Sequence, residues 1–436
     1  MRRKWAWVAL AAVFALIVAA CGDDEGETTT TAAEETTTTA AEETTTTAAE
    51  ETTTTAAEET TTTAAEEPLT VGMIMVGPYN DHGWSQAHYD AGVYLQEQLG
   101  VDFIYLDSVN TADRPETTVD QVVTQLIDQG ADIVFATSDD MKDGILLGAE
   151  LHPEVPMIWS SGDSAWAEGR DYRPDLANLG NTMGRMEYGK MIAGCAAALT
   201  SETGKIGYLG PLINAETLRL ASSVYLGAKY CWENVRGETD PLELRVDWIG
   251  FWFYIPGFST DPTLVANTFF DDGFDVVISG IDTTEGLVVA GQRAAAGETV
   301  WAIPYDYRGA CDEAPEVCLG VPYFNWGPAY KRIVESVMAG TFEAGFEWFG
   351  PDWADINDPD TSGIGFIKGP ALSAENAALL DEFIAGLADG SINLFTGPLN
   401  YQDGTPFLGD GEVATDAQIW FMEQLLEGME GASSAG

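Results

Sequence analysis

The stretch GPYNDHGWSQAH, Gly77–His88, concentrates side chains that could do chemistry. It holds a carboxylate (Asp81), two imidazoles (His82 and His88) and an indole (Trp84). One use of such a set is metal binding. The two histidines are six residues apart, however, whereas ligands on one helical face are four apart, and the chain has only three histidines. We therefore predict neither a metal site nor a cofactor.

The same stretch has two other interpretations. Asp81 precedes a helix-like segment, where a carboxylate most simply accepts hydrogen bonds from the first backbone N–H groups, and Trp84 would then be a core residue. Alternatively, Trp84 faces an aromatic ring from WIGFWFYIPGF (Trp248–Phe258). Two such rings can enclose a planar ligand, and nearby carboxylates can accept hydrogen bonds from its hydroxyl or N–H groups.

Signatures of catalysis are missing from the sequence. It contains no GxSxG motif, and TGKIGYLG (Thr203–Gly210) lacks the spacing of a phosphate-binding loop. The adjacent Asp271 and Asp272 could imitate a glycosidase pair, but such pairs occur by chance in a chain with 70 acidic residues. We expect a protein that is not an enzyme.

Short apolar strands alternate with amphipathic helices from Leu69 onward, which predicts parallel sheets covered by helices on both faces. The segments 130–139 and 273–282 resemble each other: each has a buried strand followed by small residues and a carboxylate. This predicts two similar doubly wound lobes, whose ligand lies beyond the carboxyl ends of the strands. The polar or small residues at those ends are Asn80, Asp81, Thr137, Ser138, Asp139, Ser160, Ser161, Gly280, Asp282 and Asp306.

The charge of the chain excludes one class of partner. It has 19 basic and 70 acidic residues and a formal net charge of −51. Such a surface repels DNA, RNA and anionic lipid headgroups, so we expect no nucleic acid partner.

The first residues indicate a targeting signal. MRRK is followed by an apolar run that ends in Val18-Ala19-Ala20-Cys21, which is typical of a lipoprotein signal with Cys21 as the lipidated residue. An ordinary signal peptide or a short membrane anchor is the alternative. Five TTTTAAEE repeats then span residues 28–67, and we expect a disordered tether there because they contain no apolar stripe.

The remaining four cysteines suit an oxidising compartment. Cys311 and Cys318 enclose a short acidic loop, which predicts a local disulfide, and Cys195–Cys231 would then be the second. Four buried thiols are the alternative.

The region from about Thr70 to Gly340 resembles the basic membrane protein family, the lipoprotein substrate-binding components of ABC importers that are related to the purine nucleoside receptor. Seven segments carry the resemblance, in the family's order: GPYNDHGWSQAHYDAG, ADIVFATSDDMKDGILLGAELHPEVPMIWSSG, MIAGCAAALTSETGKIGYLG, DWIGFWFYIPGFSTDP, GFDVVISGIDTTEG, AIPYDYRG and VCLGVPYFNWGPAY.

The resemblance implies a type I periplasmic-binding-protein fold, with two doubly wound α/β lobes joined by crossing strands and a ligand cleft between them. It also implies that an aromatic residue from each lobe holds the ligand and that carboxylates bind its hydroxyl groups or base edge. The residues carried over are Asp81, Trp84, one of Trp252 and Phe253 as the opposing ring, and Asp306, with Ser138, Asp139 and Asp282 at strand ends that face the cleft. Asn325 and Trp326 are further candidate ligand-binding residues, although they stand where the family differs.

The sequence departs from the nucleoside receptors at two points. Phe324, Asn325 and Trp326 stand where those receptors carry a lysine, and Gly83-Trp84 replaces a Ser-Phe pair. A purine nucleoside or base is the expected ligand. A flavin or sugar remains an alternative, as do a surface hydrolase of nucleosides or glycosides and a sensory ectodomain.

The expected organisation follows from these observations. Residues 1–20 are a lipoprotein signal, 21–67 a tether, 68–181 the first lobe, 182–306 the second lobe, and 307–436 a segment shared between the lobes plus an irregular extension. We expect a monomer on the outer face of the cell membrane, anchored by lipid, that works with an ABC permease and its ATPase.

Overall fold

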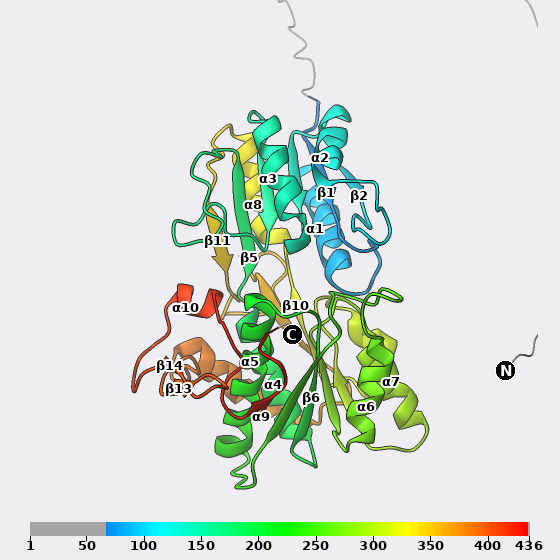
Figure 1. The fold of residues 1–436 in the computed structure, drawn as a ribbon, viewed down its shortest axis with the longest axis vertical. Coiled ribbons are helices and arrows are strands. Elements are labelled where there is room, and N and C mark those ends of the chain that lie inside the picture. Colours follow the sequence, from blue (N-terminus) through cyan, green and yellow to red (C-terminus); the bar gives the residue numbers. More distant parts are fainter. Residues whose placement is uncertain (1–66, 435–436) are drawn as a thin grey trace, which may run out of the picture. The chain divides into compact units, whose positions relative to one another are not determined.

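The structure, a computed structural model, describes residues 67–434, which form two α/β lobes (Figure 1). The predicted signal segment, the repeats and Cys21 lie outside the described residues, apart from the last residue of the repeats. The first lobe is built on a six-stranded sheet of order β11-β5-β4-β3-β1-β2, in which every pairing is parallel. Its strands are β1 (Thr70–Ile74), β2 (Asp102–Leu106), β3 (Ile133–Ala136), β4 (Met157–Ser160), β5 (Leu179–Gly184) and β11 (Phe346–Phe349).

The second lobe repeats this arrangement. Its five-stranded sheet has the order β15-β7-β6-β8-β9, and it too is entirely parallel. The strands are β6 (Lys205–Gly210), β7 (Glu243–Trp248), β8 (Val276–Ser279), β9 (Trp301–Ile303) and β15 (Met429–Glu430). In both lobes the first strand of the chain pairs with the second on one side and with the third on the other. This is the doubly wound order that the repeated strand pattern predicted.

Helices cover both sheets, as near-continuous apolar strands require. The first lobe has α1 (Trp84–Leu99), α2 (Val119–Asp128), α3 (Lys142–Leu151) and α8 (Gly327–Met338). The second lobe has α4 (Met186–Thr200), α5 (Ala215–Tyr230), α6 (Pro262–Asp271), α7 (Glu285–Ala295), α9 (Ala374–Asp389) and α10 (Asp416–Trp420).

One helix start differs from the sequence prediction. The sequence predicts that the second helix opens at Pro115, but α2 begins at Val119 and Pro115 lies in the preceding turn. The reason is a capping box, in which Thr118 and Gln121 satisfy each other's backbone N–H groups.

The chain crosses between the lobes three times. It passes from β5 into α4, so the expected boundary at residue 182 falls inside a strand of the first sheet. It then returns through β10 (Gly320–Phe324) to α8, and crosses again from β11 to β12 (Ile364–Lys368). Because β10 and β12 pair antiparallel, these two crossings form a small sheet of their own.

The last part of the chain is more regular than the sequence analysis expected. It contains the 16-residue helix α9, which packs on α4, and the short pair β13 (Leu399–Asn400) and β14 (Pro406–Leu408). It closes with β15, which extends the second sheet beside β7. This helix was not predicted from the sequence, because acidic residues are frequent in this part of the chain.

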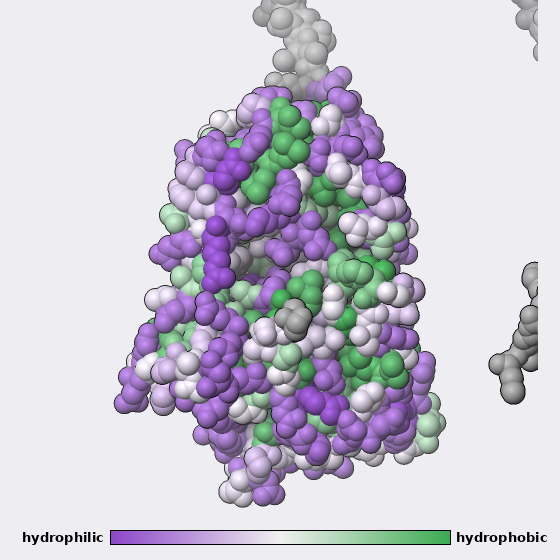
Figure 2. All heavy atoms as spheres, in the orientation of Figure 1, coloured by the Kyte–Doolittle hydropathy of each residue, from purple (hydrophilic) through white to green (hydrophobic). Residues whose placement is uncertain are grey.

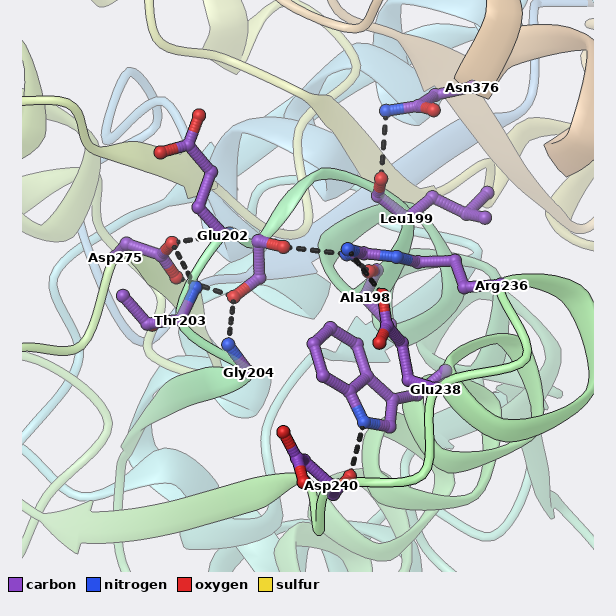
Figure 3. Close-up of polar contacts among 12 residues, drawn as sticks. Ala198, Leu199, Glu202, Thr203, Gly204, Arg236, Glu238, Asp240, Asp275 and Asn376 are labelled. Carbon is purple, nitrogen blue, oxygen red and sulfur yellow. Dashed lines mark hydrogen bonds and ion pairs between the residues drawn. The ribbon is translucent and has the colours of Figure 1, made fainter.

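A network of polar contacts ends α4 and ties it to the rest of the second lobe (Figure 3). The Asp275 carboxylate accepts hydrogen bonds from Ser201 Oγ at 2.6 Å and from the backbone N–H groups of Glu202 and Thr203 at 2.7 and 3.0 Å. Arg236 donates to the carbonyls of Ala198 and Ser201. Carbonyls at a helix C-terminus have no partners within the helix, and a cation is favourable there, so this network fixes the end of α4.

Both predicted cysteine pairs are joined in the structure. Cys195 in α4 is bonded to Cys231, which directly follows α5, and their Cα atoms are 5.2 Å apart. Cys311 is bonded to Cys318 across the acidic loop. The first bond therefore holds together two long helices of the second lobe.

Candidate functional site

The carboxyl ends of the strands in the two sheets face each other across the junction of the lobes. A cavity lies there, and Figure 2 shows a hollow between the lobes with a mainly hydrophilic rim. Its volume is about 420 Å³, which includes space that is open to solvent. The lining residues are Trp84, Ser138, Asp139, Ser161, Tyr208, Glu216, Thr217, Leu220, Trp252, Gly280, Asp282 and Tyr305.

Trp84 forms the wall that the first lobe contributes. It opens α1, directly after the loop that follows β1, and its indole N–H donates to the carbonyl of Thr137 at 2.6 Å. Phe324 and Trp326 contact it edge-on, with ring centroids 5.2 and 5.4 Å away. The ring is therefore held in one orientation from behind while it lines the cavity.

Trp252 is the aromatic residue that the second lobe contributes. It is buried and lines the cavity, and its indole N–H has no hydrogen-bond partner of normal geometry among the described residues. Phe253 points elsewhere, since it packs edge-on against Phe251 and lies near Gly77 of the first lobe. The sequence left open which of the two aromatic residues reaches the cleft, and the structure places Trp252 there.

Two tyrosines and a buried lysine lie at the second-lobe side of the cavity. Tyr208 projects from β6 and Tyr305 follows β9. Lys190 of α4 is fully buried, donates to the carbonyl of Ser279 at 2.7 Å and lies 3.1 Å from the centre of the Tyr305 ring. Burial lowers the pKa of Lys190 well below its ordinary value, and the Asp306 charge opposes this shift.

Three carboxylates line the cavity, and desolvation raises the pKa of each, although Asp139 is largely exposed and Glu216 is half-buried. It raises the pKa of Asp139 to about 6, with a further contribution from the neighbouring Asp140. It raises that of Glu216, in the first turn of α5, to about 7, although Arg219 opposes it. The pKa of Asp282 is raised by burial and then by the nearby Asp306. The cavity therefore gathers carboxylate acceptors beside the unpartnered Trp252 indole N–H and the hydroxyls of Tyr305 and Ser161.

Asp306 is the fourth carboxylate, and it lies behind the lining. It is fully buried and lies in the left-handed backbone region with φ +70°. Neither carboxylate oxygen has a hydrogen-bond partner of normal geometry among the described residues, and the nearby Tyr305 hydroxyl lowers its pKa only slightly. Burial raises its pKa well above the ordinary value, against the opposing charge of Lys190. A strained backbone and an unsatisfied carboxylate at a strand end are features that cluster at functional sites.

Asp81 does not line this cavity. Its carboxylate accepts three hydrogen bonds of 2.9 Å, from the backbone N–H groups of Gly83, Ser85 and Gln86, and so satisfies the start of α1. Burial raises its pKa, and these hydrogen bonds lower it. The geometry of Asp81 is that of a helix cap, as the local sequence suggested.

Gly83, next to Trp84, lies directly against the second lobe. A Cβ atom built on Gly83 would lie 1.6 Å from the carbonyl oxygen of Asp282 in the second lobe. Only a residue without a side chain fits this contact.

Asn325 and Trp326 lie behind the site. Asn325 donates to the carbonyls of Pro359 and Ser362, at 3.0 and 2.8 Å, and so holds a surface loop. Trp326 is fully buried and stacks on His88 at 4.3 Å. His88 in turn is hydrogen-bonded to the hydroxyl of Tyr330 at 2.7 Å. These residues support Trp84 and do not line the cavity.

The histidines take part in other contacts. His82 lies against Glu313 of the second lobe, and His88 belongs to the buried network. The described residues contain no group of three or more His, Cys, Asp or Glu side chains that could hold a metal ion.

Within the same part of the chain, no helix has the length and apolar content needed to cross a bilayer.

Sequence reasoning missed several residues of the cavity. Tyr208 lies inside a strand, and Glu216, Thr217 and Leu220 lie on the first turns of α5, whereas the search considered strand ends. The symmetry of the lobes could have identified the α5 residues. The loop between β6 and α5 corresponds to the loop between β1 and α1, which carries Trp84.

Comparison with known proteins gives a family. The family model described as "ABC transporter substrate-binding protein PnrA-like" matches residues 69–358. A purine-binding protein of Brucella abortus (strain 2308) is 28% identical over 367 residues, which cover 83% of this chain and 93% of the relative. A Haloferax volcanii protein, TsgA13, to which a glucose-binding role in an ABC transporter is provisionally assigned, is 26% identical over 64% of this chain and 63% of its own length.

Solved structures agree with the fold. A solute-binding protein of an Aeropyrum pernix ABC transporter has a TM-score of 0.59 at 16% identity, over 75% of this chain and 93% of the other. One from Conexibacter woesei has a TM-score of 0.54 at 20% identity, over 74% and 98%. The predicted type I fold is thereby confirmed. A second family model, of the new glue protein family, matches only residues 1–71, which contain the repeats.

Proposed function

Since the chain belongs to the PnrA-like family of ABC transporter substrate-binding proteins, which act outside the cytoplasm, we propose that it captures a small planar solute between Trp84 and Trp252. A purine base or purine nucleoside is the proposed solute. The protein would deliver it to an ABC permease and its ATPase, and it would do no chemistry on it. Cys21 would carry the lipid anchor, the repeats would act as a tether, and the folded part would be a monomer.

The observation that carries this proposal is the lining of the cavity. The first lobe contributes the indole of Trp84 and the second lobe contributes that of Trp252. A flat ring system can stack on aromatic side chains of this kind. The carboxylates at the edges suit the N–H and hydroxyl donors of such a ligand.

Purines agree with one further observation. The Brucella abortus relative is named a purine-binding protein, and its similarity extends over 93% of its length. The acidic lining favours a neutral, donor-rich ring over a phosphorylated one.

A thermal-shift screen tests the proposal. The panel contains adenine, hypoxanthine, their ribosides, riboflavin and pyranose sugars. A true ligand at 100 times its dissociation constant adds about 2.7 kcal/mol to the free energy of unfolding, which raises the melting temperature by several degrees. A response to pyranoses alone would overturn the planar-ligand proposal. Chromatography of the bound riboside after incubation tests for hydrolysis. Release of free base and sugar would replace the binding role by that of a hydrolase.

Lipid anchoring needs a separate test. Cys21→Ser should move the protein from the membrane fraction to the soluble fraction after cell lysis. If the variant stays in the membrane fraction, lipid at Cys21 is not the anchor.

A further inference from the structure

The C-terminal region of the chain bridges the two lobes beside the ligand cavity. It belongs to the second lobe, because β15 pairs with β7 and because Arg219 of α5 donates to the carbonyl of Trp420 at 3.5 Å. The Arg219 guanidinium also lies 4.5 Å from the centre of the Trp420 ring. α10, which ends at Trp420, lies at the junction of the lobes in Figure 1.

Trp420 packs among three aromatic residues of the first lobe. It lies edge-on to Phe346 and Trp348 of β11, with ring centroids 5.1 and 4.9 Å away, and to Trp166, in the loop after β4, at 6.0 Å. The next residue, Phe421, lies parallel to Trp166 at 5.8 Å. Trp420 is only 6% exposed, so residues of both lobes together remove its ring from water. We call these five rings the inter-lobe cluster.

Two ion pairs accompany the inter-lobe cluster. Asp416, in the first turn of α10, accepts a hydrogen bond from Arg185 at 2.6 Å, and Arg185 is the residue at which the chain passes from β5 to α4. Glu423 lies 3.5 Å from Arg170 of the first lobe, whose guanidinium lies 4.4 Å from the centre of the Phe421 ring. Ion pairs at the surface contribute little free energy, so the aromatic contacts supply most of the attraction.

The inter-lobe cluster lies on the cleft side of the strands that cross between the lobes. Trp420 and Phe421 line a cavity that shares Asp139, Ser161 and Glu216 with the ligand cavity. When two lobes open about their crossings, contacts on the cleft side separate. The inter-lobe cluster is therefore positioned to favour the closed arrangement.

We propose that the C-terminal region acts as a latch, whose aromatic contacts with the first lobe set the equilibrium between open and closed lobes in the ligand-free protein. The ligand and the latch favour the same closed state, so the latch raises the affinity for every ligand of the cleft by the same factor. The inference goes beyond the proposed function, because it does not depend on which solute the cleft binds.

Trp166→Ala tests the latch, because it removes a first-lobe ring of the inter-lobe cluster and Trp166 lines neither cavity. Trp166→Phe keeps an aromatic ring at this position. The matched control is Phe103→Ala, which removes a half-buried aromatic residue of the same lobe that packs on Tyr89 and Tyr105, both in that lobe. Circular dichroism melts establish that the unmodified protein and the three variants are folded.

Calorimetric titrations with the two tightest ligands of the purine panel give the first measurement. We expect Trp166→Ala to bind both about 3- to 30-fold more weakly, as the loss of two ring contacts between the lobes implies. Trp166→Phe should lose less than threefold, and Phe103→Ala less than twofold. Unchanged affinity in Trp166→Ala, or a loss for only one of the two ligands, would overturn the latch and leave the proposed function standing.

Small-angle scattering of the ligand-free proteins gives the second measurement, which needs no ligand. Trp166→Ala should have a larger radius of gyration than the unmodified protein, and Phe103→Ala should not. If no compound of the panel binds, the purine proposal fails, and scattering alone decides about the latch. Equal radii of gyration would then overturn it.

Discussion

Replacing Gly83 by alanine should impair closure of the two lobes while leaving each lobe intact. The alanine Cβ would lie 1.6 Å from the carbonyl oxygen of Asp282, whereas such atoms in proteins do not approach within 3.0 Å. The lobes must therefore separate by about 1.4 Å at this point. Alanine at position 83 must also adopt the backbone angles of Gly83, φ −147° and ψ −131°, within the first lobe.

The cost of this clash falls on the closed state alone. Forcing an extra methyl group into a packed contact costs about 1–3 kcal/mol. We infer that this contact between the lobes belongs to the closed state, so ligand affinity should fall by the corresponding factor, about 5- to 150-fold. The assay is calorimetric titration with the best ligand from the purine panel, together with small-angle scattering of the free and saturated protein.

Gly345→Ala is the matched control, because a Cβ atom there meets nothing within 4 Å. We expect Gly83→Ala to bind weakly and to compact less on saturation than the unmodified protein, and Gly345→Ala to do neither. Unchanged affinity and unchanged compaction in Gly83→Ala would refute the reasoning, since the contact between the lobes would then be unnecessary for ligand capture.

Three further predictions concern stability. Asp81→Asn should lower the free energy of unfolding by about 1 kcal/mol, because the charged helix cap is lost. It should change ligand affinity less than twofold. A tenfold loss of affinity in calorimetric titration would place Asp81 in the site. Replacing Cys195 and Cys231 together by serine should cost about 2–4 kcal/mol in urea unfolding, because the bond spans 36 residues, and an unchanged midpoint would contradict this. The raised pKa of Glu216, about 7, means that the folded protein binds a proton there that the unfolded chain has lost. The free energy of unfolding of the ligand-free protein should therefore fall as the pH rises from about 4.5 to 7. In thermal melts of Glu216→Gln this decrease should be smaller by about 1 kcal/mol. If the decrease is the same in the variant, Glu216 is not its cause.

The fold could be predicted from local patterns because the central strands are buried on both faces. β3 and β8 are nearly continuous apolar runs, and the small residues and carboxylates that follow them indicate where the strands end. α9 was missed although ten of its 16 residues are Ala, Leu, Ile or Phe, because the whole acidic segment around it was treated as irregular. The position of Pro115 misled the prediction for α2, since the cap at Thr118 outweighed it.

The site could be predicted only in part, since strand ends specify a place and not an orientation. Ser138, Asp139 and Asp282 follow strands and line the cavity, as their positions suggested. Asp81 also follows a strand, but the free N–H groups of α1 engage its carboxylate first. Asn325 likewise binds a loop that the sequence gave no reason to place beside it.

The acidic lining leads to a last prediction, about which ligands can drive closure. A ligand shifts a conformational equilibrium only through its different affinities for the two states. Asp282 and Asp306 are buried in this structure, Glu216 is half-buried and Asp139 is largely exposed. The raised pKa values of all four express the cost of removing these carboxylates from water. A ligand that donates hydrogen bonds offsets this cost, whereas an anion increases it.

The size of this effect follows from Coulomb's law. One added negative charge about 6 Å from a carboxylate costs about 3 kcal/mol at an effective dielectric constant of about 20, which corresponds to a factor of about 100 in affinity. Adenosine monophosphate should therefore bind at least 100-fold more weakly than adenosine in calorimetric titrations at pH 8, where all but the most strongly perturbed of these carboxylates are ionised. Lowering the pH to 5.5 should narrow the gap, because Glu216 and Asp139 become protonated. Equal affinities at pH 8 would mean that the phosphate avoids the acidic lining, and the argument from charge would then be wrong.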